Sequence, residues 1–311
     1  MNTATDRVMI GERVGDLPDW LAPVLVMELR QALRTPFFLV PFAGIHAVAL
    51  VALLIEFQWL ANTGHSGSGT GGVLSQPFWG LVSLALVLVL PMRNLGTLYG
   101  LKRQGSFELV LISGLSAARL VVGQWLVQCG LTLLVFVSLF PYIIFRYFFG
   151  GVEVVETLIV MVSVLGASIA SSALVIGVSG YGNVGIRLGL LAFAEFVVII
   201  GGITGIEGLV ESQAFNTGNF FHLLVLIYWI LSLVLFFAFY TICGLQLGRA
   251  HLQCAIGRPG VTTKRFAVAI LISPILLFAG SLVTCFYGFG IVMVPMLIWI
   301  WKMGNLSGKP R

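Results

Sequence analysis

The sequence predicts an all-α polytopic integral membrane protein with six to eight transmembrane helices, and three observations indicate this class. Hydrophobic residues make up 59% of the 311 residues and charged residues only 9%, with a mean hydropathy of +1.04. A soluble domain is about half apolar and cannot bury such an excess. The apolar residues form runs of about 20 or more, the length that crosses a hydrocarbon core of about 30 Å. The basic residues lie in short segments between these runs, where they orient the spans, so we expect no nucleic-acid partner.

Residues 1–36 are predicted to form a cytoplasmic tail that ends in an interfacial amphipathic helix between Trp20 and Arg34. At about 100° per residue, most leucine and alanine side chains of this stretch share one arc, and Glu28, Arg30 and Arg34 lie opposite. Trp20 is then an aromatic anchor in the interface, and the arginines face lipid headgroups. A soluble helix is the alternative, but the stretch continues directly into the first span.

The transmembrane domain is expected over residues 37–301, followed by a second cytoplasmic tail at 302–311. The apolar runs predict spans at residues 37–60, 77–98, 120–145, 157–177, 186–206 and 220–247. The apolar stretch 266–301 is too long for one straight span and barely long enough for two. The charge pattern favours a helical hairpin there, and one span with a re-entrant piece is the alternative.

The basic residues also predict the orientation of the spans. With the amino terminus inside, four basic residues precede the first span, three follow the second span, and four lie within 249–265. Arg187 is then also inside, and Arg146 is the one basic residue of the outer loops. This bias predicts that both termini are cytoplasmic.

The segment from Lys102 to Gln124 has the sequence K-R-Q-G-S-F-E-L-V-L-I-S-G-L-S-A-A-R-L-V-V-G-Q. Its composition is compatible with a helix, and its charges are set among apolar residues in an amphipathic pattern. A short helix of this kind docks in a groove through an apolar ridge, and flanking charges fix its register. We therefore interpret residues 99–119 as the contact with a soluble partner. A helix that lies on the bilayer with solvated charges is the alternative.

This segment, with the helix and the two spans before it, resembles the membrane subunit of type-two ABC (ATP-binding cassette) transporters. In that family the first cytoplasmic loop reads approximately E-R-x-x-G-T-x-E-x-L-L-x-T-P-L-S-x-x-x-I-V-x-G-K. The corresponding places here are held by Arg103, Gly105, Ser106, Glu108, Leu109, Leu111, Leu115, Ser116, Val121 and Gly123. The chain departs from the pattern because it lacks the leading Glu, has Ser113-Gly114 for T-P, and ends in Gln124 instead of Lys. The detailed resemblance covers about the first 140 residues.

The resemblance implies a permease subunit whose coupling helix seats in a groove of a separate P-loop ATPase subunit. The implied ATPase-coupling residues are Lys102, Arg103, Gly105, Glu108, Leu109, Ile112, Leu115 and Arg119. It also implies a second permease chain, identical or different, and a bacterial or archaeal plasma membrane. The sequence has no G-x-x-x-x-G-K-[ST] motif, so ATP and Mg²⁺ belong to the partner. We expect no cofactor and no enzymatic activity in this chain.

Two ionisable residues fall inside predicted spans, where their energetic cost makes them functional candidates. Glu195 lies near the middle of the 186–206 span and His46 lies in the first span, so both are candidates for a substrate path. Glu195 fits equally well as a protonated carboxyl that is hydrogen-bonded between helices, and a pair with Arg187 is a third possibility. His46 is better explained as a neutral packing residue. The scattered cysteines and histidines predict no metal site.

Glycine spacing predicts close helix packing in the same region. Gly185 with Gly189, and Gly201 with Gly205, form G-x-x-x-G pairs that allow another helix to approach.

Two other functions are compatible with the sequence. A stand-alone proton-coupled carrier would bind and release protons at Glu195. A rhomboid-like intramembrane serine protease would use Ser179 of the G-x-S-G sequence at 177–180, with His251 as its base. Against the protease, Cys254 stands where a glycine is expected after the histidine, and both residues fall at predicted cytoplasmic span ends.

Overall fold

The structure, a computed structural model, describes residues 29–63, 77–103, 116–149, 154–214, 220–255, 263–284 and 289–306. These residues are helical apart from short turns, and they include no strand. Within them, seven helical stretches are long and apolar enough to cross a membrane, and a shorter apolar helix follows. This confirms the predicted class, an all-α multi-pass membrane protein.

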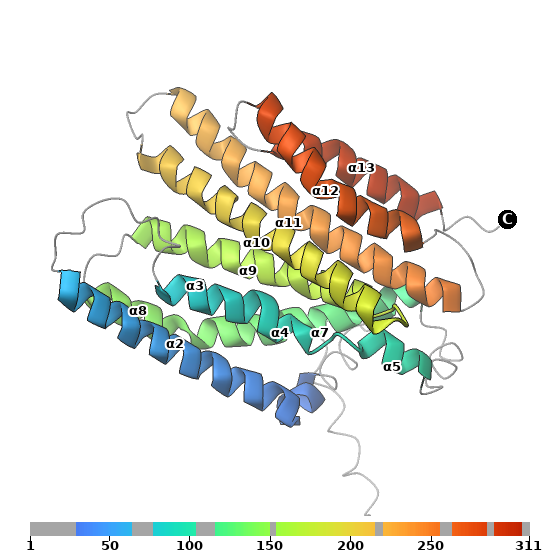
Figure 1. Ribbon diagram of the computed structural model, residues 1–311, viewed down its shortest axis with the longest axis horizontal. Coiled ribbons are helices and arrows are strands. Elements are labelled where there is room, and N and C mark those ends of the chain that lie inside the picture. Colours follow the sequence, from blue (N-terminus) through green and yellow to red (C-terminus); the bar gives the residue numbers. More distant parts are fainter. Residues whose placement is uncertain are drawn as a thin grey trace, which may run out of the picture.

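The helices pack side by side along a common long direction (Figure 1). In chain order they are α2 (Pro36–Thr63), α3 (Pro77–Leu84), the π-helical turn η2 (Ala85–Val89), α4 (Leu90–Met92), α5 (Thr97–Arg103), α7 (Ala117–Ser138), α8 (Phe140–Phe149), α9 (Val154–Val178), α10 (Val184–Ala214), α11 (Phe220–Ala255), α12 (Thr263–Val283) and α13 (Gly290–Leu306). We call the end of the bundle where α9 leads into α10 the Arg187 end. The opposite end, where α8 lies, is the Arg146 end.

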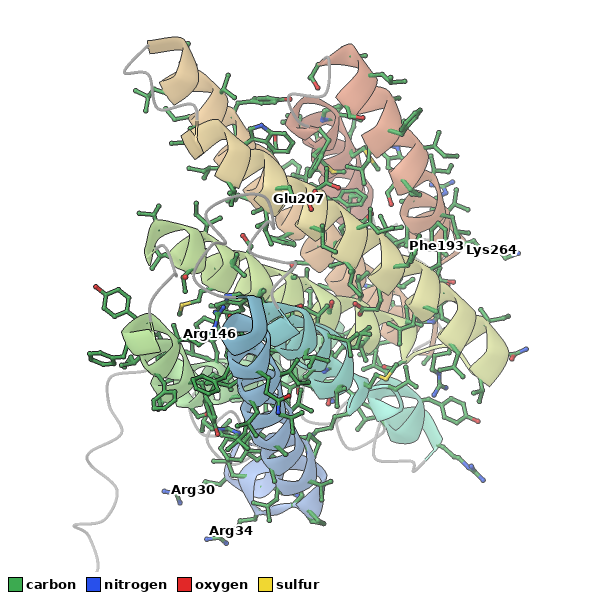
Figure 2. All side chains as sticks on the ribbon, turned by 60° about the vertical axis from the view of Figure 1, so that its left-hand side comes forward. Arg30, Arg34, Arg146, Phe193, Glu207 and Lys264 are labelled. Carbon is green, nitrogen blue, oxygen red and sulfur yellow. The ribbon has the colours of Figure 1, made fainter. Side chains whose placement is uncertain are left out.

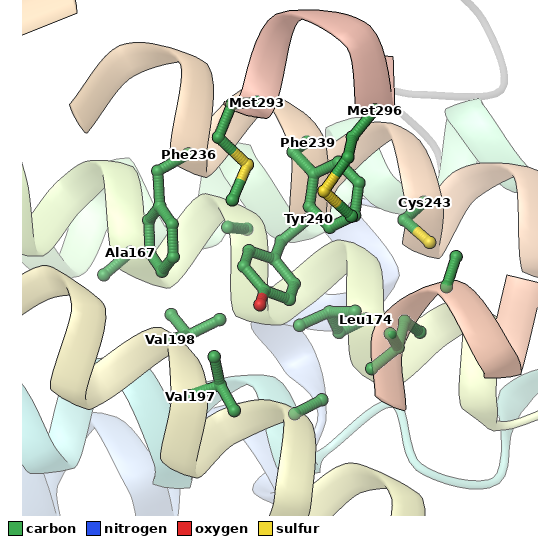
Figure 3. Packing of buried hydrophobic residues seen from close by; sticks show 14 of the residues in the cluster. Ala167, Leu174, Val197, Val198, Phe236, Phe239, Tyr240, Cys243, Met293 and Met296 are labelled. Atoms are coloured by element: carbon green, nitrogen blue, oxygen red, sulfur yellow. The ribbon is translucent and has the colours of Figure 1, made fainter. Parts of the chain in front are cut away.

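Helix α9 is the central element. In its most apolar window 72% of the residues are buried, compared with 22–39% in the other six candidate spans. The first half of α9 joins a hydrophobic cluster with α2, α3, η2 and α7, which we call the amino-terminal cluster. Its second half joins a cluster with α10, α11, α12 and α13, the carboxy-terminal cluster, where Tyr240 packs among side chains of α9 and α10 (Figure 3). The bundle therefore has two halves, and α9 belongs to both.

Helices α9 and α11 approach each other to backbone contact because glycines lie at their crossing. A Cβ atom on Gly244 would lie 2.5 Å from the carbonyl carbon and oxygen of Ala173 and 2.7 Å from the Leu174 nitrogen. A Cβ atom on Gly177 would overlap the Gly244 backbone. Small residues are typical of such crossings in membrane proteins, where close backbone packing replaces the hydrophobic effect.

The predicted glycine pair at 201 and 205 also receives α11. A Cβ atom on Gly201 would collide with the Phe236 ring, and one on Gly205 would lie 2.5 Å from Leu233. The other predicted pair does not pack in this way, because the space around Gly189 is open to 4 Å.

The structure divides two stretches that the sequence analysis predicted as continuous spans. The span expected at 120–145 is interrupted at Leu139, between α7 and α8, because Pro141 has no N–H and its ring excludes the carbonyl four residues earlier. The span expected at 77–98 contains the π-helical turn η2 and ends in a turn at 93–96.

The apolar stretch 266–301 forms two packed helices, of which the first is a candidate span and the second is a shorter apolar helix. It consists of α12 and α13, and a Cβ atom on Gly280 would lie 2.7 Å from the Val292 side chain. The two helices lie side by side (Figure 1).

Candidate functional site

Both described flanks of the predicted coupling segment pack into one small hydrophobic cluster at the Arg187 end. This end cluster joins α5 and the start of α7 to the last turns of α9 and α11, and its buried members are Leu98, Val121, Ile176 and Leu252. The Ser116 hydroxyl accepts a hydrogen bond from the Arg119 backbone N–H at 3.3 Å and caps α7. The segment is therefore anchored on both sides to the two helices that cross at Gly244.

Most of the predicted ATPase-coupling residues lie outside the described residues, namely Gly105, Glu108, Leu109, Ile112 and Leu115. Lys102 lies in the last turn of α5. Arg103 and Arg119, one on each flank, are exposed. The docking surface predicted for this segment stays a prediction.

Only the last turns of the predicted interfacial helix, from residue 29 on, lie among the described residues, and they follow the expected amphipathic pattern in part. Trp20 and Glu28 lie outside the described residues. Ala32 is buried, whereas Arg30 and Arg34 are exposed and project outward beside the start of α2 (Figure 2). The chain turns into α2 at Thr35, whose hydroxyl donates to the Ala32 carbonyl at 2.7 Å. Leu33, which was expected on the apolar face, is exposed.

Glu195 is buried between α9 and α10 and is only 3% exposed. The Ser171 hydroxyl of α9 donates to its Oε2 atom at 2.6 Å. Its Oε1 atom is buried and has no hydrogen-bond partner among the described residues. This arrangement matches the alternative of a carboxyl that is hydrogen-bonded between helices.

Ser168, one turn before Ser171 on α9, binds the π-helical turn η2. Its hydroxyl donates to the Leu86 carbonyl at 2.8 Å. In η2 the Leu90 N–H bonds to the Ala85 carbonyl, five residues earlier. The next such donor would be the N–H of residue 91, but this residue is Pro91, so the Leu86 carbonyl has no donor in this register. The Ser168 hydroxyl therefore takes the place of the missing backbone donor to the Leu86 carbonyl. Turns of π-helix are frequent at functional sites.

We expect Ser168→Ala to destabilise the protein by about 1–3 kcal/mol, because it leaves the buried Leu86 carbonyl unsatisfied. In a Pro91→Ala background the restored N–H supplies the missing donor, so the same substitution should cost clearly less. Chemical unfolding of the four proteins in detergent micelles measures this coupling as a double-mutant cycle. Equal costs in both backgrounds would contradict this account of η2.

Arg187 does not pair with Glu195. Its guanidinium donates to the carbonyl of Leu95 at 3.1 Å and to that of Tyr181 at 2.5 Å, and it lies over the Tyr99 ring at 5.2 Å. Both carbonyls follow helix C-termini, where a cation is favourable. Partial burial raises the pKa of the Tyr181 phenol above its ordinary value, so this ring stays neutral.

His46 lies on α2 as a packing residue. Its Nδ1 atom is 2.9 Å from the Phe42 carbonyl, and its ring lies 4.4 Å from that of Phe42 and 5.8 Å from that of Tyr142. These rings pack on the amino-terminal cluster, whereas the neighbours of Glu195 on α10 belong to the carboxy-terminal cluster. The structure therefore does not bring His46 and Glu195 into one path.

Arg146 is buried, although the sequence analysis placed it in an outer loop. It lies in α8, is 4% exposed, and forms an ion pair with Glu56 of α2 through two hydrogen bonds of 2.9 and 2.5 Å. Its guanidinium also lies over the rings of Phe78 and Trp79 of α3, at 4.7 and 5.8 Å. The prediction was wrong because α8 continues the helical stretch of α7 and packs against α2, so that this charge faces the bundle. Figure 2 shows Arg146 beside α2, away from Arg30 and Arg34.

The two residues of the serine-protease alternative come from adjacent segments at the Arg187 end. A Cβ atom on Gly180 would touch the His251 ring, which packs edge-on against Tyr181 at 4.3 Å. The Ser179 hydroxyl donates to the Ile176 carbonyl at 2.7 Å and accepts from the Leu98 N–H at 3.2 Å. Its proton thus goes to a carbonyl instead of His251, which disfavours a catalytic dyad.

Comparisons with known proteins identify no relative, because no protein-family model, no curated protein and no solved structure matches the chain. The described residues also contain no group of three or more His, Cys, Asp or Glu side chains that could hold a metal ion.

Proposed function

We propose that this chain is the permease subunit of an ABC transporter and moves a substrate across the membrane with ATP hydrolysed by a separate ATPase subunit. Two kinds of support exist. The segment 102–124 resembles the coupling region of that family, and the fold is an all-α multi-pass bundle with at least seven candidate spans. By the same resemblance, the working unit includes a second permease chain and lies in a bacterial or archaeal plasma membrane, with both termini in the cytoplasm.

The observation that carries the proposal is the anchoring of the coupling segment. Its flanks, α5 and α7, pack in the end cluster against the last turns of α9 and α11. These two helices touch backbone to backbone at Gly177 and Gly244, so they resist sliding past each other. A push on the segment by the ATPase therefore reaches the central helix of the bundle directly.

The mechanism follows from this connection. Closure of the ATPase around ATP displaces the coupling segment, and α9 and α11 move with it. Because α9 belongs to both hydrophobic clusters, its displacement changes the contact between the two halves of the bundle. Such a rearrangement opens a path first on one side of the membrane and then on the other.

Glu108→Lys is expected to reduce the recovery of a co-purifying P-loop ATPase at least about tenfold, because a reversed charge opposes its counterpart in the groove. The measurement is gentle extraction from native membranes, followed by identification of the co-purifying chains. The control is Glu211→Lys, the same change of charge in the α10 turns at the Arg146 end. An unchanged recovery with Glu108→Lys would contradict the coupling role.

A stand-alone proton-coupled carrier is the second candidate, and the buried Glu195 is the observation that favours it. The same purification separates the two. A well-folded wild-type protein that is recovered without any ATPase would favour the carrier.

A further inference from the structure

The buried carboxyl of Glu195 lies beside residues of the carboxy-terminal cluster, about one turn of α9 from the junction where the two halves of the bundle meet. On α9, Val164 belongs to the amino-terminal cluster and Ala167 to the carboxy-terminal cluster, so the division falls between them. Within the next turn, Ser168 binds η2 and Ser171 binds Glu195. One face of α9 thus bonds both to the second span and to α10 near this junction.

Burial and the surrounding hydrogen bonds favour the neutral form of Glu195. An ionised carboxylate at 3% exposure needs a countercharge or several donors, but the described residues supply Glu195 with the Ser171 hydroxyl alone. Arg187, the basic residue of the same helix, is held by two carbonyls at the Arg187 end. A bound proton neutralises the Glu195 carboxyl and, unlike a larger counterion, needs no cavity beside it.

The other titratable groups near α10 have partners elsewhere or lie at its ends. In α11, the Tyr240 hydroxyl is 2.7 Å from Ser273 of α12, and Cys243 faces the Phe266 carbonyl. Helix η2 contains no titratable side chain. The remaining groups on α9 to α12 are toward the helix ends: Glu156, Arg187, Glu207, Glu211, His222, Tyr228, Arg249, His251, Cys254, Lys264 and Arg265. Among those whose side chains the structure describes, none forms a hydrogen bond or ion pair with Glu195.

We propose that Glu195 is a proton-binding site between α9 and α10, neutral and hydrogen-bonded to Ser171 while these two helices are packed together, and that it releases its proton when α9 moves away from α10. This movement removes the Ser171 contact and admits water between α9 and α10. The Oε1–H bond then breaks, the proton passes to water and the carboxylate remains. The release step rests on the proposed transport function, because the transport cycle is what moves α9. The presence of the bound proton does not depend on that function.

Infrared spectroscopy of the purified protein in lipid bilayers tests the proton directly. The carbonyl stretch of a protonated carboxylic acid is separate from the bands of a carboxylate. We expect such a band at neutral pH in the wild type and in Glu56→Gln, and its loss in Glu195→Gln. Its absence from the wild type, or its persistence in Glu195→Gln, would overturn the assignment. In D2O the band should shift as the site opens, and a band that never shifts would overturn the release step.

Thermal unfolding at several pH values provides a second test. A carboxyl that is neutral in the fold but ionised in the unfolded chain contributes stability at low pH, and this contribution is lost as pH rises. The Tm of the wild type should therefore fall relative to that of Glu195→Gln as pH increases. Parallel curves would overturn the proposal, and so would a failure of Glu195→Gln to fold, since a neutral amide replaces a neutral carboxyl. Glu195→Gln should recover as much ATPase as the wild type, so a failure here is distinguishable from a failure of the permease assignment.

Discussion

Gly244→Ala is expected to cost at least about 3 kcal/mol of stability, at the upper end of the usual range for overpacking. The added methyl group would lie 2.5 Å from the carbonyl atoms of Ala173 in α9. Backbone atoms cannot rotate away as a side chain can, so α9 and α11 must move apart along their whole contact. Chemical unfolding in detergent micelles measures the loss.

The matched control is Gly189→Ala on α10, where a Cβ atom would meet nothing within 4 Å. This substitution should leave stability unchanged or raise it by up to about 1 kcal/mol, because alanine restricts the unfolded chain more than glycine does. If both substitutions have the same small effect, the two helices do not cross as closely as the structure describes.

The same crossing has a functional consequence under the proposed mechanism. The end cluster joins the coupling segment to α9 at Ile176, next to Gly177, and to α11 at Leu252, about two turns after Gly244. A variant that folds but holds these helices apart should still recruit the ATPase, since the coupling segment itself is intact. Its transport should fail, because a displacement of the coupling segment no longer moves α9 and α11 together.

The sequence predicted the order of the helices well because each span is a separate apolar run, and hydrophobic length is a local property. It did not predict where helices break. Pro141 and Pro91 were visible in the sequence, but their apolar surroundings led us to include both in continuous spans. The consequence of Pro91 depends on Ser168, which lies 77 positions away and is placed by tertiary packing.

The candidate site was predicted in part. Glu195 was found from sequence because an ionisable residue within an apolar run is costly. Its partner was missed, although the serines of α9 were a usable signal, since Ser168, Ser171 and Ser172 lie close together in a very apolar span. Arg187 was considered as a partner for Glu195 but bonds to the Leu95 and Tyr181 carbonyls, because it lies in the first turn of α10 beside two helix ends.

The two partners of the ion pair at the Arg146 end are unequally buried, so we expect their removal to lower stability by different amounts. The Arg146 side chain is 3% exposed and that of Glu56 is 18% exposed. Removing one partner of a buried pair costs about 3–5 kcal/mol, because the charge that stays behind loses its hydrogen-bonded countercharge. Glu56→Met leaves the guanidinium, which cannot lose its proton, at the more buried position. Arg146→Met leaves the carboxylate at the more exposed position, where it reaches water.

We therefore expect Glu56→Met to be the more destabilising single substitution, even though the Phe78 and Trp79 rings favour the cation by about 1–2 kcal/mol. The double variant, Glu56→Met with Arg146→Met, removes both charges and should recover most of the stability that Glu56→Met loses. Unfolding of the four proteins in detergent micelles tests both statements. The contrary result is that both single substitutions lower the free energy of unfolding equally and that the double variant loses the sum of the two. The two charges would then contribute independently, and their ion pair would not hold α8 against α2.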